Sequence, residues 1–449
     1  MLGNTGSKEK LWTVLDWRGG QATVDQILLT RGLEFDAAKE TAVREIIQAV
    51  RRQGDAALLE YTARFDQVKL TPELIAVSPA EFATAAAQVS AEFRQAIQVA
   101  AERIRRYHQR QLPQNWEYTD EIGAVLGRRY VPLNRVGVYV PGGRAPYPST
   151  VLMNIIPPQV AGVQSICVVT PPGKDGQINP HILVAAELLG VTEVYKVGGA
   201  QAIAALAYGT ETIPRVDKIC GPGNLYVTLA KKQVYGTVGI DMLAGPSEIA
   251  VVADVDANPR YVAADLLSQA EHDPEAGAFL VTTSSELAQA VENQLVQQLA
   301  KLERGATARE ALNRWGRCFL VDSIEVGLDL VNRLAPEHLE LYVADPERYL
   351  EQVRSAGTVF LGGYTPEPLG DYVSGTNHVL PTHGTARFSS GLSVDDFLKR
   401  MSYSQYPREA LLHLAPSVVA LAETEGFTAH ANAVKVRLEE DEDGSAERS

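Results

Sequence analysis

The stretch Glu193-Val-Tyr-Lys-Val-Gly-Gly-Ala-Gln-Ala-Ile203 decides the fold class. It begins with a short β-branched run that predicts a buried strand, and it passes through Gly198-Gly199 into a helical pattern over 200–208. A strand that turns through glycine into a helix is the repeating unit of parallel α/β sheets. This stretch therefore predicts an α/β fold.

The same alternation continues on both sides of this stretch. Helical patterns lie around 178–189, 224–235 and 258–272. The runs that we interpret as buried strands are 136–140, 165–170, 193–197, 249–253, 279–283, 317–321, 339–343 and 358–361. They fall into two groups, roughly 130–240 and 245–365, and this grouping predicts two parallel α/β domains.

Helices are also predicted outside these two groups. Asp36 can cap a helix that stops at Gly54, and a second long helix is predicted from Ser78-Pro79 to the region before Pro113. After Gly362 the chain is rich in Gly, Pro, Thr and Ser up to about residue 392, which predicts a long functional loop. A final helix is predicted near 407–424.

Composition excludes several classes of protein. Apolar residues make up 45% and charged residues 21% of the 449 residues, as in ordinary soluble proteins, and no apolar run is long enough to cross a bilayer. The polar N-terminus shows no secretory signal. The three cysteines are odd in number and far apart, so we expect a reducing, cytoplasmic location without disulfides.

The charge balance argues against nucleic acid as a partner. The formal net charge is −14, and the segment 439–449 contains six acids and one Arg. We interpret 436–449 as a solvated, disordered acidic tail. The rest of the chain is still acidic and has no basic cluster, so we expect neither nucleic acid nor a membrane as a partner.

Three glycine-rich loops follow predicted strands: Pro141-Gly-Gly-Arg144, Gly198-Gly-Ala-Gln201 and Gly221-Pro-Gly-Asn224. Glycine lets a backbone approach a phosphate, and the helix that follows supplies N–H donors. One such loop is weak evidence, because tight turns use glycine for structural reasons alone. Three in succession favour a nucleotide-type ligand, but none matches the full G-x-G-x-x-G fingerprint, so the pattern alone does not name NAD.

Candidate metal ligands are scattered along the chain. Gln269 and His272 lie at i and i+3 on one face of a helix end, Asp371 and His378 lie in the long loop, and His430 lies near the C-terminus. Imidazole nitrogens mixed with carboxylate oxygens suit zinc. An isolated Q-x-x-H is more often an ordinary exposed helix end, and spacing over more than a hundred residues cannot prove that these side chains converge.

Two further features carry possible chemistry. Glu337-His338 stands directly before a strand and offers two proton acceptors of different natural pKa, although neighbouring side chains at a strand edge point to opposite sides unless a turn reorients them. Cys220, just before Gly221, invites a thiohemiacetal mechanism. No adjacent His or positive charge is evident in the sequence to lower its pKa, so we interpret it as structural.

In combination these motifs resemble the histidinol dehydrogenase family, and the resemblance runs from about residue 40 to residue 435. The many ordered matches are far more specific than any single one. The matching stretches are 136–143, 198–203, 221–224, 244–249, 269–272, 335–340, 370–381, 387–393 and 425–430. Every motif position agrees with the family pattern.

The resemblance implies roles for individual residues. It implies zinc ligands at Gln269, His272, Asp371 and His430, with one zinc per subunit. It implies proton acceptors at Glu337 and His338 and contacts to NAD at Tyr139, Gln201 and Asn224. Contacts to substrate are implied at Ser247 and Glu425, at His378, at His338 and at the four zinc ligands. It also implies that Cys220 is not a nucleophile.

The resemblance further implies an architecture and a reaction. The fold would be two incomplete Rossmann-like parallel-sheet domains with smaller N- and C-terminal dimer-forming segments. The expected boundaries are 1–35 for an N-terminal segment, 36–125 with 245–380 for a discontinuous first domain, 126–244 for the second domain, 381–435 for a dimerisation segment and 436–449 for the tail. His430 and Glu425 would reach the partner's site in a homodimer. The reaction would convert L-histidinol, two NAD+ and water to L-histidine and two NADH.

Two alternatives remain open at this stage. A related enzyme could oxidise a different amino alcohol or diol, and turnover on a panel of alcohols would separate the two. The other alternative is a non-catalytic zinc-binding or scaffold protein descended from the enzyme. The intact dyad and ligand positions count against it, and an NADH absorbance assay would decide.

Overall fold

The computed structural model describes residues 11–18, 36–142 and 146–444. Contacts divide the chain into two compact units, the first made of Met1–Gln111 and Leu133–Phe397 and the second of Leu112–Pro132 and Leu398–Ser449. The predicted N-terminal segment is described only over 11–18, and Gly143 and Arg144 of the first glycine-rich loop lie outside the described residues. Among the described residues, no helix is long and apolar enough to cross a membrane.

One parallel sheet of the first unit contains five strands, and the decisive stretch supplies its edge strand. The strand order is β6-β5-β4-β7-β8, and all the pairings are parallel. The strands are β4 (Arg135–Tyr139), β5 (Ser165–Val169), β6 (Val194–Tyr195), β7 (Lys218–Cys220) and β8 (Gly239–Ile240). Since parallel strands share one carboxyl edge, all three predicted glycine-rich loops follow strands at the same edge of this sheet.

The other parallel sheet of the first unit contains six strands in the order β1-β11-β10-β9-β12-β13. Its members are β1 (Thr13–Asp16), β9 (Glu248–Ala253), β10 (Gly277–Thr282), β11 (Arg317–Leu320), β12 (His338–Tyr342) and β13 (Thr358–Leu361). Strands β9 and β10 are buried along their whole length, as strands covered on both faces must be. The predicted α/β fold with two parallel sheets is confirmed.

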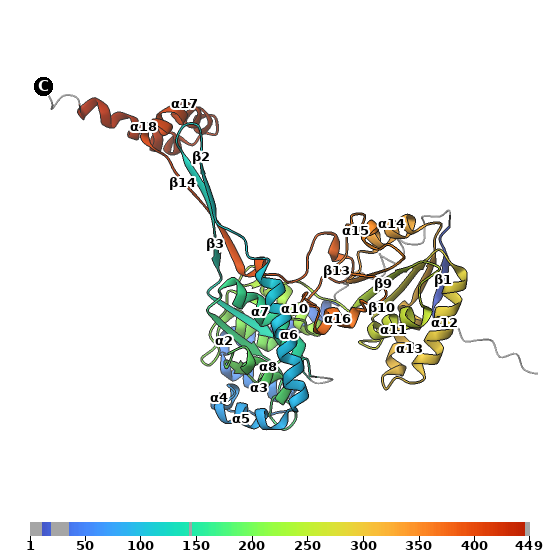
Figure 1. The fold of residues 1–449 in the computed structure, drawn as a ribbon. Coiled ribbons are helices and arrows are strands. Elements are labelled where there is room, and N and C mark those ends of the chain that lie inside the picture. Colours follow the sequence, from blue (N-terminus) through green and yellow to red (C-terminus); the bar gives the residue numbers. More distant parts are fainter. Residues whose placement is uncertain (1–10, 19–35, 143–145, 445–449) are drawn as a thin grey trace, which may run out of the picture. The chain divides into compact units, whose positions relative to one another are not determined.

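Helices cover both faces of the six-stranded sheet (Figure 1). On one face α11 (Pro259–Ala270), α12 (Ser285–Leu299) and α13 (Gly305–Trp315) bury a cluster of Leu, Val and Ala side chains. On the other face α14 (Ile324–Leu334) packs over Ala250, Val252 and Leu339. The short helices α15 (Glu347–Leu350) and α16 (Glu367–Tyr372) follow β12 and β13.

The N-terminal helices pack with the five-stranded sheet. Helices α2 (Ala37–Gln53) and α3 (Asp55–Phe65) share a core with α9 (Gly199–Tyr208) and α10 (Leu225–Val234), while α5 (Pro79–Gln88) contacts α8 (Pro180–Leu188) and α6 (Ala91–Gln109) contacts α7 (Pro148–Ala161). An apolar helix face does not specify which of two similar sheets it will cover. The predicted domain boundaries, with 36–125 grouped with 245–380, stay a prediction.

The predicted long helix between Ser78 and Pro113 is two helices. Ser78 caps α5 with a capping box, in which its side chain and that of Glu81 bond reciprocally to backbone N–H groups. Val89 is extended and Ser90 caps α6 through the Phe93 N–H. Serine competes for backbone hydrogen bonds, so a second serine in a helical pattern can start a new helix. The short α4 (Pro72–Ile75) precedes them.

The second unit is an antiparallel sheet with two helices. Strand β3 (Val125–Pro132) pairs with β2 (Trp116–Thr119) and with β14 (Leu398–Gln405), and α17 (Arg408–Thr424) packs on α18 (Thr428–Gly444). The hairpin and β14 were not predicted. Helix α18 extends through 436–444, where we expected a disordered tail, because Leu and Glu favour helices even when charges of one sign accumulate. Residues 445–449 lie outside the described part.

Candidate active site

Glu337 and His338 lie where α14 turns into β12, and both reach the same neighbouring residue. Glu337 Oε2 accepts the backbone N–H of Glu248 at 3.0 Å, and His338 Nδ1 donates to the backbone carbonyl of Glu248 at 3.0 Å. The two side chains approach to 3.8 Å. Ala335, in the left-handed conformation with φ 48°, makes the turn that redirects them. The dyad therefore faces β9 as a pair.

Burial drives the pKa values of the dyad in opposite directions. It lowers the pKa of His338 from 6.5 to about 4, so the imidazole is neutral at pH 7. It raises the pKa of Glu337 well above its ordinary value, and the nearby Glu248 and Asp371 carboxylates raise it further, while hydrogen bonds from the Glu248 peptide and the Ser247 side chain oppose the rise. Since Nδ1 of His338 donates to a carbonyl, Nε2 is its basic nitrogen.

The end of α11 brings Gln269 and His272 together. Gln269 is fully buried, and its Nε2 lies 3.4 Å from Nδ1 of His272. Within the described part of the chain, Gln269 Oε1 is buried without a hydrogen-bond partner. A buried amide oxygen without a donor is costly, which fits an oxygen that a cation would occupy.

Asp371 at the end of α16 adds a carboxylate close to the dyad. One ligand atom each from His338, Glu367 and Asp371 lies within 4.8 Å of the others, a grouping that can hold a metal ion. His378 donates through Nδ1 to the Asp371 backbone carbonyl at 3.0 Å. The electrostatic influence of His272 reaches both His338 and His378, so these residues surround one space in the first unit.

Glu367 was not predicted from the sequence. It is 1% exposed, accepts a hydrogen bond from the Ser268 hydroxyl at 3.1 Å, and places Oε1 3.7 Å from His338 Nε2. Burial and then the charge of Asp371 raise its pKa to about 8. Its backbone N–H donates to Glu340, which in turn hydrogen-bonds Asp265. The only sequence signal was an acid four residues before Asp371 in a long loop, which is too common to be diagnostic.

The side chains predicted to contact NAD lie at the carboxyl edge of the five-stranded sheet. Tyr139 is 3% exposed, and its hydroxyl accepts the Gly199 N–H at 3.2 Å. Gln201 is 1% exposed, and neither amide atom has a hydrogen-bond partner among the described residues. Asn224 is exposed and uses Oδ1 to cap α10 through two backbone N–H groups, which leaves its amide NH₂ to donate.

Cys220 is buried at the end of β7, with Sγ 3.8 Å from the Gly137 carbonyl oxygen. Two positive charges, Lys231 on α10 and Lys218 two residues earlier in β7, act to lower its pKa. Burial outweighs them and, with the Asp241 carboxylate, raises the pKa of the thiol well above its ordinary value. A buried neutral thiol is a poor nucleophile.

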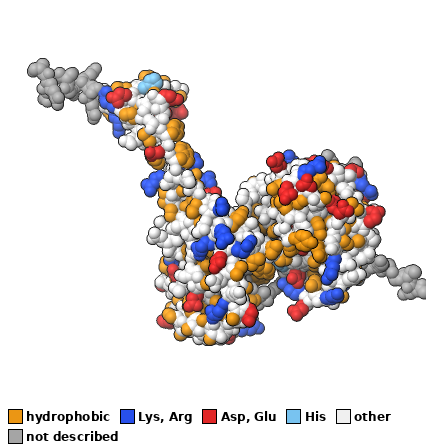
Figure 2. All heavy atoms as spheres, in the orientation of Figure 1, with side chains coloured by type: hydrophobic (Ala, Val, Ile, Leu, Met, Phe, Trp, Pro, Cys, Tyr) orange, Lys and Arg blue, Asp and Glu red, His pale blue; other side chains and the backbone are white. Residues whose placement is uncertain are grey.

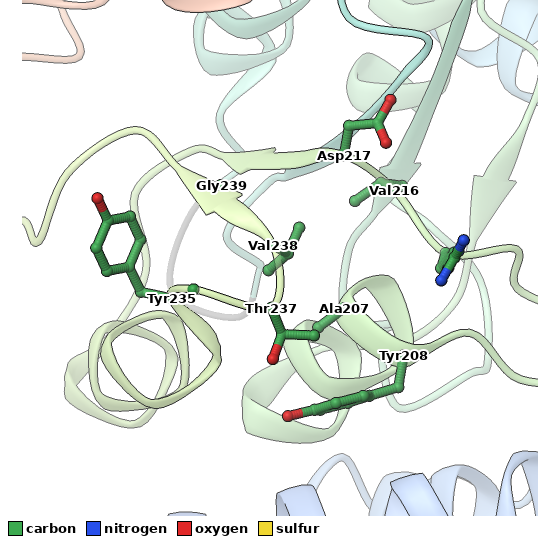
Figure 3. Close-up of a pocket in the computed structure, with 10 residues that line it drawn as sticks. Ala207, Tyr208, Val216, Asp217, Tyr235, Thr237, Val238 and Gly239 are labelled. Atoms are coloured by element: carbon green, nitrogen blue, oxygen red, sulfur yellow. The ribbon is translucent and has the colours of Figure 1, made fainter. Parts of the chain in front are cut away.

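A separate pocket of ≈ 480 Å³ lies at the other end of the five-stranded sheet. Tyr208, Asp217 and Tyr235 line it beside the amino ends of β7 and β8 (Figure 3). Ligands of open parallel sheets bind beyond the carboxyl ends of the strands, so this pocket is on the wrong edge for the predicted dinucleotide. It contains none of the predicted site residues.

His430 and Glu425 belong to the second unit. Both are exposed, and the Phe427 ring lies 5.1 Å from the His430 ring. Within the first unit, the structure brings together Ser247, Gln269, His272, Glu337, His338, Asp371 and His378. The donor set present there, with imidazoles, carboxylates and an unpartnered buried amide oxygen, fits a divalent cation of the zinc type.

Comparisons with known proteins agree on one family. The family model described as histidinol dehydrogenase matches residues 29–438. The chain is 54% identical to "Histidinol dehydrogenase" of Synechococcus sp. over 399 residues, which cover 89% of this chain and 92% of that protein. It is 54% identical to the protein of the same name from Geobacillus kaustophilus, covering 93% and 98%. The crystal structure of histidinol dehydrogenase from Elizabethkingia anophelis superposes with a TM-score of 0.92 at 41% identity, covering 97% of this chain and 99% of that one.

Proposed function

Because the chain belongs to the histidinol dehydrogenase family, we propose that it catalyses the zinc-dependent oxidation of L-histidinol through L-histidinal to L-histidine with two NAD+, the last steps of L-histidine biosynthesis. The observation that carries this proposal is the pairing of a neutral His338 with Glu337 beside Asp371, Gln269 and His272. A buried base next to metal-type donors is what an alcohol oxidation by hydride transfer requires.

His338 is the proton acceptor for both oxidations. Its Nε2 takes the hydroxyl proton of the alcohol, releases it to solvent, and later takes the proton of the aldehyde hydrate, while the backbone carbonyl of Glu248 holds the ring by Nδ1. Glu337 deprotonates the water that adds to the aldehyde. A zinc ion held by the metal-type donors beside them would supply a fixed binding point for substrate nitrogens, and a bound NAD+ would supply the hydride acceptor. Keeping the aldehyde bound protects a reactive compound from solvent.

The proposed zinc ligands are Gln269, His272, Asp371 and, from the second unit of a partner subunit, His430, with one zinc per subunit. The support is the amide oxygen of Gln269, which has no hydrogen-bond partner within 11–18, 36–142 and 146–444, and the proximity of this side chain to His272. The alternative grouping with His338 and Glu367 shares Asp371. We prefer the first set because His338 then stays free to act as a base. A cation beside Asp371 would also favour the ionised form of Glu337 that base catalysis needs.

Substrate and cofactor contacts complete the proposal. Ser247, His378 and Glu425 would contact L-histidinol together with His338 and the zinc ligands. NAD would contact Tyr139, Gln201 and Asn224. In support, Gln201 is buried and its amide atoms have no hydrogen-bond partner in the described part of the chain, and Ser247 hydrogen-bonds Glu337. The polar atoms of Gln201 would find their partners on the dinucleotide.

We further propose a homodimer with shared active sites, in which 381–435 forms the dimerisation segment. The support is the apolar surface of the second unit, visible as orange side chains along its strands and helices (Figure 2). Its large exposed apolar side chains are Leu112, Trp116, Tyr118, Met401, Tyr403, Tyr406, Leu412, Val418, Leu421, Phe427 and Val436. So many on so small a unit indicate an interaction surface.

A cytoplasmic location is proposed with the support of three unpaired, buried cysteines.

A turnover panel tests this proposal against its alternatives. Purified protein is assayed for NADH absorbance with L-histidinol, L-histidinal and several amino alcohols and diols, before and after zinc is removed with a chelator. We expect turnover only with histidinol and histidinal, lost on chelation and restored by zinc. Preferred turnover of another alcohol would identify a related dehydrogenase, and no NADH from any alcohol would favour a scaffold protein.

A further inference from the structure

Gly221 is the first residue of the loop Gly221-Pro-Gly-Asn224, and both its backbone groups are held by one buried ion pair. It follows β7 directly and has φ +109°, a conformation that favours glycine. A Cβ there would clash with the backbone oxygen of Tyr139, so the loop passes very close to β4. The position of Gly221 is therefore fixed on one side by the sheet itself.

Lys231 and Asp241 fix the other side. Lys231 Nζ donates to the Gly221 carbonyl at 3.1 Å and forms an ion pair with Asp241. Asp241 Oδ2 accepts the Gly221 N–H at 2.8 Å, and its Oδ1 accepts the Met242 N–H at 2.6 Å. The side chains are 3% and 1% exposed. Every charged atom of the pair thus has a partner, and two of the bonds go to Gly221.

The rest of the loop depends on where Gly221 is held. Asn224, three residues later, caps α10, and Lys231 projects from the same helix. Helix α10, the loop and the residue after β8 are therefore joined at Gly221 through Lys231 and Asp241. A purely apolar contact would hold this junction without directional bonds, whereas the ion pair defines the orientation of one peptide unit.

We propose that Lys231 and Asp241 are positioning residues for the dinucleotide: their ion pair holds the Gly221–Asn224 loop in the conformation that binds NAD. This inference rests on the proposed use of NAD+. A preordered loop raises affinity because less conformational entropy is lost on binding. Without the ion pair the protein would still fold, but the Gly221–Asn224 loop would become ordered only when the cofactor binds.

The experiment compares NADH binding with loop mobility in zinc-loaded protein. Breaking one partner of a buried ion pair destabilises strongly, whereas replacing both with apolar residues is often neutral for stability. The main variant is therefore Lys231→Met/Asp241→Leu, and Asp241→Asn is a milder second variant. NADH affinity is measured by fluorescence titration, and hydrogen–deuterium exchange is followed in the peptide containing 221–224 without cofactor.

We expect faster exchange in this peptide and a dissociation constant for NADH raised about tenfold in both variants, with little change in zinc content. The matched control is Lys218→Met, which breaks the partly buried Lys218–Asp396 ion pair at the other end of β7. It should lower Tm and leave the NADH dissociation constant unchanged.

The outcomes separate this inference from the proposed function. Wild-type affinity in both folded variants would overturn the positioning role and leave the dehydrogenase proposal intact. An equal loss of NADH affinity in Lys218→Met would also overturn it, because general destabilisation would then explain the effect. Absence of NADH binding by the wild-type protein would overturn the inference together with the proposed NAD chemistry.

Discussion

Glu337 and His338 are adjacent in the sequence, and burial shifts their pKa values in opposite directions. The same burial that lowers the pKa of the His338 imidazole raises the pKa of the Glu337 carboxyl. The backbone N–H of Glu248 donates to Glu337 and its backbone carbonyl accepts from His338, so one residue fixes the relative geometry of both side chains. This arrangement suits two bases that act at different stages of one reaction.

The first prediction concerns this division of labour. Glu337→Gln should impair the oxidation of added histidinal more than the first oxidation of histidinol, because only the second step needs an activated water. His338→Asn should slow both steps. Each role is worth on the order of two to four decades in rate. Half-reactions measured by NADH absorbance check this, and equal, mild effects of both changes on both steps would refute the assignment.

The second prediction concerns Cys220. Cys220→Ala should keep most of the activity, since a buried neutral thiol contributes only packing, and it should lower stability by on the order of 1 kcal/mol. Activity and Tm are measured on zinc-loaded protein. If activity vanished while fold and zinc content were unchanged, covalent catalysis by the thiol would have to be accepted.

Single residues could be predicted only where they stand in recognisable motifs. Gln269, His272 and the dyad could be selected because the resemblance singles them out, and their convergence needed the fold. Glu367 and the Lys231–Asp241 pair carry no motif of their own. Their roles can be recognised only in the folded structure, where β7, β8, α10 and α16 are in place. Contacts between residues that are far apart in the sequence produce no periodic sequence pattern.

At the scale of elements, α6 ends in a buried histidine that gives a third prediction. His108 donates through Nδ1 to the Ile104 carbonyl at 2.8 Å, and its Nε2 lies 3.4 Å from Nδ2 of Asn377. Burial lowers its pKa below the ordinary 6.5. As pH falls, His108 therefore takes up a proton in the unfolded chain before it does so in the folded chain. The folded state is favoured fully above the unfolded pKa of about 6.5, and the free energy of unfolding decreases as pH falls below it.

Thermal unfolding at pH 7 and pH 5 checks this expectation. The decrease in Tm between the two pH values should be smaller in His108→Gln than in the wild type, because Gln does not titrate. His181, which is only partly buried in the first turn of α8, provides the matched control as His181→Gln. An unchanged decrease in His108→Gln would contradict the expectation.

The strands were the most predictable elements, and the connections were the least. Eight apolar runs were predicted as strands and all eight are strands of the two parallel sheets, because a strand buried on both faces needs a continuous apolar run. The hairpin β2–β3 and β14 escaped prediction because β2 and β14 are largely exposed, β3 is only partly buried, and none follows an apolar pattern. Which sheet the N-terminal helices cover was also beyond a periodicity argument.

At the scale of the whole molecule, the fourth prediction is that each active site contains residues of two chains. Inactive His272→Ala and His430→Ala chains are mixed under conditions of subunit exchange. If the proposed homodimer shares its sites, one site of each heterodimer collects both lesions and the other collects none. Activity should therefore return toward half of the wild-type value per heterodimer.

The control for this mixing experiment is exchange itself, shown with differently tagged chains. A matched pair, His272→Ala mixed with Gln269→Ala, should stay inactive, because both lesions lie in the same unit of the chain. Exchange without recovery of activity in the first mixture would show that His430 serves its own chain or no site at all.

The central claim is a four-electron oxidation at one site, and the stoichiometry of NADH tests it most directly. A limiting, known amount of L-histidinol is consumed to completion by the zinc-loaded protein in excess NAD+, and NADH is measured by absorbance while free aldehyde is trapped. We predict two NADH and one L-histidine per histidinol, with no trapped aldehyde. One NADH per histidinol with accumulated histidinal, or none, would contradict the claim.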